Sequence, residues 1–184
     1  MHDKLRSAGP RAIIVMGVSG SGKSTLGGML AGELNCDFLE GDVFHSPEAV
    51  ARMRAGIPLT DEDRWPWLER LGRAIDAKVA TDGITVAACS ALRRVYRDRL
   101  RSVITAPVSF ILMDADHDEL LRRMTGRTGH YMPPSLLTSQ LNTLERPDAD
   151  EPVLTLDSRQ PVASACTQTF TWLQAGSPSR ANGG

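Results

Sequence analysis

The sequence contains few cysteines, no long apolar run and no excess of either charge. Cys36, Cys89 and Cys166 are too few and too scattered for a disulfide framework or a paired-cysteine metal site. We therefore expect them to be reduced thiols of a cytoplasmic protein. The longest apolar run, 12–18, is far shorter than the roughly 20 residues that a helix needs to cross a bilayer. Residues 1–12 lack the apolar stretch of a signal peptide, so we expect no membrane partner.

The charges are balanced, with 21 Lys and Arg against 22 Asp and Glu, which gives a formal net charge of −1. Proteins that bind polyanions usually present a strongly basic surface, so nucleic acid is not an expected partner. The content of hydrophobic residues, 41%, is that of an ordinary globular chain, and 184 residues suit one domain. We expect this domain at 12–175, between flexible polar tails at 1–11 and 176–184.

Short apolar runs alternate with helical patterns between the two tails. The apolar runs predict strands at 12–16, 36–40, 84–89, 108–113 and 153–157. Hydrophobic residues at helical spacing predict helices around 26–34, 68–79, 92–100, 120–124 and 162–173. Such alternation favours an α/β fold, in which a parallel sheet has helices on both faces. Ligands of these folds bind beyond the carboxyl ends of the strands, so the segments after each strand are the places to look for function.

The first strand is followed by a segment that matches the pattern GxxxxGK[ST] at every fixed position. We expect the whole segment to bind nucleotide, through Gly17, Val18, Ser19, Gly20, Ser21, Gly22, Lys23, Ser24 and Thr25. The glycines let backbone N–H groups point inward around a β-phosphate, and the next helix adds its positive N-terminal end. Lys23 can reach the β- and γ-phosphates as a catalytic cation, and the Ser24 hydroxyl can ligate Mg²⁺. This loop predicts a nucleoside triphosphate and a metal, but not the reaction.

Two further patterns separate the classes of protein that use this loop. A guanine-nucleotide switch carries an Asn-Lys-x-Asp motif, which the sequence lacks. The run 110–114 resembles the acidic strand end of motor and transporter ATPases, but it leads into a helix for which Asp116 is the expected N-cap. We interpret Asp114 as a loop or cap residue, with a metal site as the alternative. The charged segment after the second strand favours a small-molecule kinase.

That charged segment, about 42–68, is the expected acceptor-binding region. A phosphoryl acceptor needs a hydroxyl in line with the γ-phosphate and a carboxylate that orients it and takes its proton. Asp42 is the expected catalytic carboxylate, because it follows a strand near the phosphate loop; indirect support of Mg²⁺ is its alternative role. His45 and Arg64 are expected to bind a polar, anionic substrate. Their alternatives are a hydrogen bond at a helix start for His45 and a surface ion pair with Asp61 for Arg64.

Other residues nearby have simpler expected roles. The cluster Asp61–Asp63 is typical of a helix cap, and Trp65 and Trp67 are typical of core packing. After the third strand, Ser90 is expected either to touch substrate or to cap the next helix. That helix is strongly basic, which predicts a mostly solvated face from which one arginine could reach the acceptor. Its arginines are Arg93, Arg94, Arg97, Arg99 and Arg101.

Taken together, these patterns resemble the gluconate kinase family of P-loop sugar-acid kinases. The matching motifs are MGVSGSGKST at 16–25, GDxxH at 41–45, GxPLxDxDRxPWL at 56–68, CSALxxxYRDxLR at 89–101, GH at 129–130 and QP at 160–161. They span roughly 12–174. The runs at 56–68 and 89–101 are long and unusual, and shikimate kinases and nucleoside-monophosphate kinases are not expected to carry them.

The resemblance implies a three-layer P-loop kinase fold whose five-stranded parallel sheet has the order 2-3-1-4-5. It implies ATP and Mg²⁺ as cofactors, phosphorylation of D-gluconate to 6-phospho-D-gluconate, and a homodimer. A kinase that resembles shikimate kinase, or one for a nucleoside or nucleotide, is an alternative in the same class. A nucleotide-dependent regulatory module without transfer activity is an alternative in another class, against which the intact Lys23, Ser24, Asp42 and Arg127 argue.

The resemblance also implies a mobile lid at about 123–135. Arg123, Arg127 and His130 fall within it. We expect Arg123 and Arg127 to close over the phosphates, with Arg127 as a catalytic residue, because added positive charge and exclusion of water favour transfer. Surface charge pairs are the alternative for both arginines. His130 is expected to contact the substrate, and Gln160 and Pro161, after the fifth strand, are expected to lie against the adenine.

Overall fold

The computed structural model describes residues 5, 9–125 and 134–176, and the structural statements below concern these ranges. Five parallel strands form one sheet in the order β2-β3-β1-β4-β5, which confirms the fold class and the strand order expected from the sequence. The strands are β1 (Arg11–Met16), β2 (Phe38–Glu40), β3 (Ile84–Ala88), β4 (Val108–Asp114) and β5 (Val153–Asp157). In the central strand, Ile13 lies opposite Val86 of β3 and Ser109 of β4.

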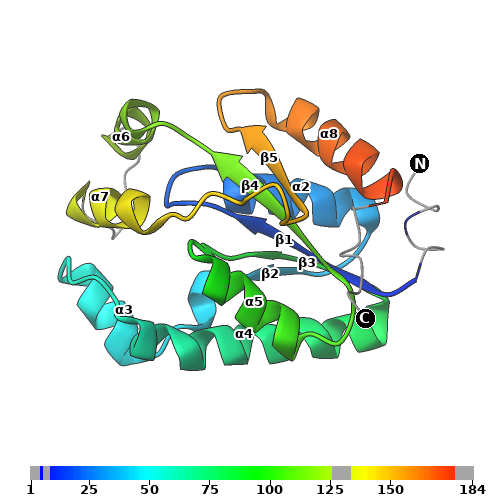
Figure 1. Cartoon of the computed structure of the whole chain (residues 1–184), viewed down its shortest axis with the longest axis horizontal. Coiled ribbons are helices and arrows are strands. Elements are labelled where there is room, and N and C mark those ends of the chain that lie inside the picture. Colours follow the sequence, from blue (N-terminus) through cyan, green and yellow to red (C-terminus); the bar gives the residue numbers. More distant parts are fainter. Residues whose placement is uncertain (1–4, 6–8, 126–133, 177–184) are drawn as a thin grey trace.

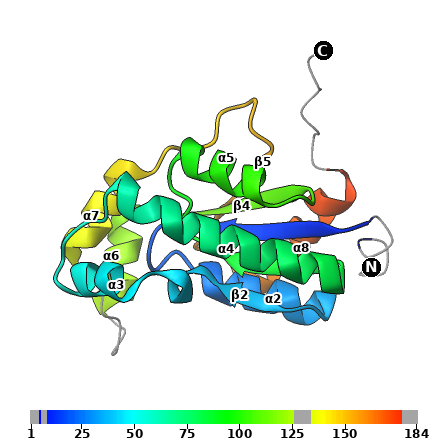
Figure 2. The same cartoon turned by 90° about the horizontal axis from the view of Figure 1, so that it is seen from below.

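Helices cover both faces of the sheet. They are α2 (Lys23–Leu34), α3 (Pro47–Arg54), α4 (Asp61–Asp82), α5 (Arg94–Val103), α6 (His117–Thr125), α7 (Pro134–Thr143) and α8 (Val162–Gln174), together with the short 3₁₀ helix η1 (Gly41–Phe44). In Figure 1, α2 and α8 lie on one face, and α4 and α5 lie on the other. Helices α3, α6 and α7 gather at one end of the sheet, beyond the carboxyl ends of the strands (Figures 1 and 2). No helix in the described ranges is long and apolar enough to cross a membrane.

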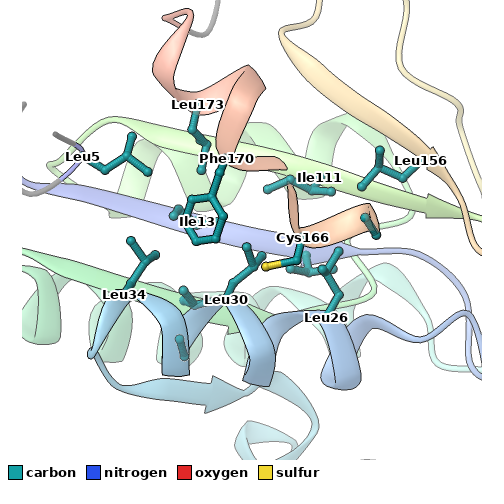
Figure 3. Close-up of a cluster of buried hydrophobic side chains, with 14 of the residues drawn as sticks. Leu5, Ile13, Leu26, Leu30, Leu34, Ile111, Leu156, Cys166, Phe170 and Leu173 are labelled. Carbon is teal, nitrogen blue, oxygen red and sulfur yellow. The ribbon is translucent and has the colours of Figure 1, made fainter. Parts of the chain in front are cut away.

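The core consists of a layer on each face of the sheet. Ile13 and Val15 face α2 and α8, whereas Ile14 and Met16 face α4 and α5, and all four side chains are fully buried. Figure 3 shows the first layer, in which Phe170 of α8 packs among the leucines of α2 and Ile13. Burial on both faces explains why the strands appear in the sequence as continuous apolar runs rather than as alternating patterns.

Helix α4 differs from expectation because it begins at Asp61 rather than near Leu68. Thr60 and Asp63 form a reciprocal capping box, in which each side chain accepts a hydrogen bond from the other residue's backbone N–H at 3.3 and 2.8 Å. This confirms the expected capping role of the acidic cluster. The helix also contains Pro66. A polar first turn and an internal proline together hide the start of this helix from the hydrophobic pattern.

Two further regions differ from expectation, and one expected cap is confirmed. Helix α7, which begins at the second of two consecutive prolines, was not expected as a helix at all. Strand β1 begins at Arg11, and Leu5 is buried in the core cluster under α2 and α8, although both belong to the expected N-terminal tail. The carboxylate of Asp116 accepts from the backbone N–H of Glu119 at 2.8 Å, which confirms it as the cap of α6. The strand ends and α7 thus define the part of the molecule in which the site lies.

Candidate active site

The phosphate loop has the backbone that its glycines predict. Gly17, Gly20 and Gly22 have φ values of 140°, 78° and 97°, a region that other L-residues rarely adopt. A Cβ atom on Gly17 would lie 2.8 Å from the carbonyl oxygen of Met113, so any side chain there would collide with β4. Gly22 is the N-cap of α2, which places the positive end of that helix at the loop.

Lys23 lies within this loop and beside two carboxylates. Its Nζ donates to the carbonyl oxygen of Val18 at 2.9 Å. Burial lowers the pKa of Lys23, while the nearby negative charges of Asp42 and Glu40 oppose that shift. The ammonium group is therefore held against the loop with carboxylates next to it. This position suits a cation that contacts the terminal phosphates of a nucleotide.

Ser24 shows which carboxylate accompanies the expected magnesium ligand. Its Oγ donates to Oε2 of Glu40, at the end of β2, at 2.5 Å. No role was expected for Glu40 from the sequence, although its place at the end of a strand near the phosphate loop is a signal that could have suggested one. Within the described ranges no three His, Cys, Asp or Glu side chains gather into a metal cluster. A hydroxyl and one carboxylate fit Mg²⁺, which binds through few protein oxygens plus phosphate and water.

A cavity adjoins the phosphate loop and brings together residues from distant parts of the chain. Its lining includes Lys23, Asp42, His45, Arg64, Ser90 and Gln140. Five of these six residues were expected in one site from the sequence, and the structure places those five around one space. Gln140 comes from α7, the helix that the sequence did not predict. Ser139 and Leu136 of the same helix also line this space.

Arg64 is held in the cavity wall by a polar network. Its Nη1 donates to the hydroxyl of Tyr96 at 3.0 Å and lies 3.6 Å from a carboxylate oxygen of Asp61. The Tyr96 hydroxyl donates in turn to Asp61, which also accepts from Arg93 at 2.6 Å. The hydrogen bond from Tyr96 and the charge of Arg93 lower the pKa of Asp61. The ion pair considered for Arg64 is therefore present, and it orients the guanidinium at the cavity.

His45 is a neutral group in this wall. Its ring stacks on Trp67, with the centroids 4.1 Å apart and the planes at 16°. Burial lowers the pKa of His45 to about 4, so the imidazole carries no charge at neutral pH. Its Nδ1 is buried and has no hydrogen-bond partner among the described residues. The alternative role at a helix start belongs to Ser46 instead, whose Oγ accepts from the N–H of Ala49 at 3.2 Å.

Trp67 is buried and donates its indole N–H to the carbonyl oxygen of Gly41 at 2.7 Å. It therefore packs in the core, as expected, and also fixes the turn that carries Asp42. Ser90 lines the cavity and is not a helix cap, because α5 begins four residues later and has Arg93 at its N-cap position. Burial raises the pKa of Cys89 to about 12, which leaves this thiol uncharged and unreactive.

The basic helix α5 corrects one expectation. Arg97 is 1% exposed rather than solvated, and it pairs with the buried carboxylate of Glu151. Arg93 and Arg94 also point to acceptors, at Glu145 and Asp150. Arg93, Arg94 and Arg97 therefore connect α5 to the chain between α7 and β5, whereas Arg99 pairs with Glu69 of α4. None of the five arginines lines the cavity described above.

Arg123 and Gln160, which were expected to bind nucleotide, both have partners within the protein. Arg123 forms an ion pair with Glu119 at 2.7 Å and donates to the carbonyl oxygens of Ser158 at 2.7 Å and of Gly20, in the phosphate loop, at 3.5 Å. Gln160 accepts a hydrogen bond from Gln168. Pro161 is the N-cap residue of α8. Arg127 and His130, for which the sequence predicts roles in catalysis and substrate contact, lie outside the described residues, as does most of the expected lid.

Asp114, at the end of β4, forms an ion pair with an arginine. Its carboxylate accepts from Nη2 of Arg146 at 3.0 Å. Asp114 is therefore the last residue of a strand and not the expected loop or cap residue, since Asp116 caps α6. The contact with Arg146 gives the metal alternative no support. The fold, the phosphate loop and the adjoining polar cavity together define a P-loop kinase of small molecules.

Comparisons with known proteins narrow this class. Residues 13–147 match the family described as the AAA domain. The chain is 42% identical to the thermosensitive gluconokinase of Escherichia coli K12, across 85% of this chain and 84% of the relative. It is 45% identical to the gluconokinase of Gluconobacter oxydans 621H, across 83% and 85% of the two chains.

Solved structures agree with these relatives. A gluconokinase from Sinorhizobium meliloti 1021 matches with a TM-score of 0.80 at 42% identity, across 91% of this chain and 94% of that one. An unliganded sugar kinase from Janibacter sp. HTCC2649 matches with a TM-score of 0.84 at 47% identity, across 91% and 96%. The chain belongs to the gluconokinase family of P-loop kinases.

Proposed function

We propose that this protein transfers the γ-phosphoryl group of ATP to D-gluconate and yields ADP and 6-phospho-D-gluconate. The observation that carries the proposal is the cavity beside the phosphate loop, which holds Lys23, Asp42 and Arg64 in one space. These groups supply a cation for the phosphates, a carboxylate for the acceptor hydroxyl and a guanidinium for an acid. Relatives that share about two fifths of the sequence are named gluconokinases.

In this reaction a gluconate hydroxyl oxygen forms a bond to the γ-phosphorus, and the bond from that phosphorus to the β–γ bridging oxygen breaks. Asp42 accepts the hydroxyl proton, and the leaving group is ADP. Lys23 stabilises negative charge on the phosphates. Arg64, oriented by Tyr96 and Asp61, binds the gluconate carboxylate. Neutral His45, which lines the cavity, contacts the substrate without adding charge.

Ser24 and Glu40 are the residues that would hold Mg²⁺, directly or through water. When bound with ATP, the ion neutralises charge on the phosphate oxygens. The hydrogen bond between the two side chains keeps both oxygens at the start of α2, where the phosphates enter. We further propose that Arg123, Arg127 and Gln160 serve the nucleotide, that His130 contacts the acceptor, and that the protein is a cytoplasmic homodimer. Light scattering of the purified protein tests the last point.

The activity is tested by measuring ADP release with Mg-ATP and a panel of acceptors. The panel contains gluconate, other aldonates, glucose, shikimate and nucleosides. We expect rapid release with gluconate and background release with shikimate and nucleosides. Release with a different acceptor would contradict the substrate assignment but not the kinase chemistry. If no acceptor stimulates release, the protein is a nucleotide-dependent regulatory module instead.

A further inference from the structure

Helix α7 reaches the phosphate loop through one side chain. Oε1 of Gln140 accepts from the backbone N–H of Ser19 at 2.7 Å, which connects positions 121 residues apart. Gln140 also lines the acceptor cavity, and so do Leu136 and Ser139. These three positions follow helical i, i+3, i+4 spacing and therefore share one face of α7. That face is both a wall of the acceptor cavity and a support of the phosphate loop.

Ser19 occupies the point at which nucleotide and acceptor meet. It is the third residue of the loop, and it lines the same cavity as Lys23 and Asp42. The backbone N–H groups of such loops point at phosphate oxygens, and the loop lysine reaches the β- and γ-phosphates. The end of the loop that borders the acceptor cavity therefore faces the phosphoryl group that is transferred. Gln140 is hydrogen-bonded to this end.

The backbone of α7 is fixed on both sides, so the position of Gln140 is defined. Leu136 packs with Met53 and Leu59 of the acceptor segment. Just after the helix, the backbone N–H of Glu145 donates to the carbonyl oxygen of Leu92 at 2.8 Å. The Glu145 carboxylate also accepts from the side chain of Arg93 at 3.1 Å and from the backbone N–H of Arg94 at 2.8 Å. Gln140 thus projects from a helix that is anchored to the acceptor segment and to the segment after β3.

We propose that Gln140 is a positioning residue for phosphoryl transfer, which fixes the Ser19 end of the phosphate loop against the acceptor cavity. Its carboxamide lies beside the γ-phosphate of bound ATP. The proposal rests on the proposed function, because it concerns the same site. A carboxamide suits this place because its oxygen accepts from Ser19 while the group carries no charge. A carboxylate could also accept from Ser19, but it would repel the γ-phosphate.

The experiment compares Gln140→Glu, Gln140→Ala and Asn142→Ala with the wild-type protein. Asn142 is exposed on α7 and serves as the matched control. The first readout is the Kd of ADP and of AMPPNP, an ATP analogue that is not hydrolysed, by titration calorimetry with Mg²⁺. We expect Gln140→Glu to raise the Kd of AMPPNP by a factor at least ten times larger than the factor by which it raises the Kd of ADP. It keeps an acceptor for Ser19 and nearly the same size, so folding is retained and only the γ-phosphate distinguishes the two ligands.

The second readout is the kinetics of gluconate phosphorylation. We expect Gln140→Ala to lower kcat at least tenfold while ADP affinity stays within threefold, and Asn142→Ala to stay within twofold of wild type throughout. Equal effects of Gln140→Glu on ADP and AMPPNP, or no effect on either, would overturn the proposal, as would a wild-type kcat in Gln140→Ala. If the wild-type protein does not phosphorylate gluconate, the proposed function fails, whereas the nucleotide comparison still decides the role of Gln140.

Discussion

Arg97 and Glu151 form a two-pronged ion pair in the interior of the protein. The two contacts, Nε to Oε1 and Nη2 to Oε2, are each 2.6 Å long, and the side chains are 1% and 0% exposed. The third nitrogen of Arg97 donates to the carbonyl oxygens of Ala91 and Glu145, each at 3.2 Å. This pair therefore connects α5 to the segment that carries Ser90 and to the chain before β5.

Removing one partner of this pair should destabilise the fold strongly. Arg97→Met leaves the buried Glu151 carboxylate without its main partner, and such a loss costs about 3–5 kcal/mol. We expect a fall of this size in the free energy of unfolding, measured by urea denaturation. The double variant Arg97→Met with Glu151→Leu should recover part of the loss, because the buried carboxylate is removed as well and Arg101, its other partner, keeps its ion pair with Asp98. Equal stability of Arg97→Met and wild type would show that the pair contributes nothing to the fold.

Asp42→Asn should abolish transfer without weakening nucleotide binding. The amide keeps the shape of the side chain but cannot take the acceptor proton, and loss of a general base lowers kcat by about 10²–10⁴-fold. ADP affinity should stay the same or rise, since a negative charge near Lys23 is removed. Glu48→Gln, an exposed change on α3, is the control for a lost carboxylate. A near-normal kcat in Asp42→Asn would rule out Asp42 as the base.

Arg64→Ala should impair recognition of the acid rather than of ATP. We expect the KM for gluconate to rise about 10–100-fold, because a charge-assisted hydrogen bond is worth about 1.5–3 kcal/mol. The KM for ATP should change little. The variant's kcat/KM for sorbitol, a neutral polyol, should fall less than its kcat/KM for gluconate, so the preference for the acid should shrink. Arg73→Ala, an exposed arginine of α4 that pairs with Glu69, is the matched control. An unchanged preference would show that another group binds the carboxylate.

The pH dependence of stability should reveal the neutral state of His45. Its folded-state pKa of about 4 lies below the ordinary 6.5, so the unfolded chain binds the extra proton between these values. Stability from this group is complete above pH 6.5 and is lost as the pH falls towards 4, by up to about 3 kcal/mol. His45→Phe keeps a ring that can stack on Trp67 but does not titrate. Urea denaturation at pH 7 and pH 4.5 should therefore show a smaller fall in the free energy of unfolding for the variant than for the wild type. Equal falls would contradict the lowered pKa of His45.

The phosphate loop could be predicted from local sequence, and the strand order from the resemblance to a kinase family, but the arginine network could not. The run from Gly17 to Ser24 is specified by adjacent residues, and its geometry follows from where the glycines lie. By contrast, five arginines in one helix suggested a solvated face, whereas Arg97 is buried against a carboxylate 54 residues later in the sequence. A single sequence does not indicate such a partner, because the pairing depends on how two distant segments pack.

The same distinction applies to the candidate site. The sequence alone determined the fold class, the phosphate loop and the acceptor candidates Asp42, His45 and Arg64, because these depend on patterns within short segments. Tertiary structure alone decided that Glu40 accompanies Ser24 and that Gln140 reaches the phosphate loop. It also decided that Arg64 is oriented by a tyrosine on another helix. The physical reason is that hydrogen-bond partners are chosen by proximity in space, which only the packing of the sheet and its helices creates.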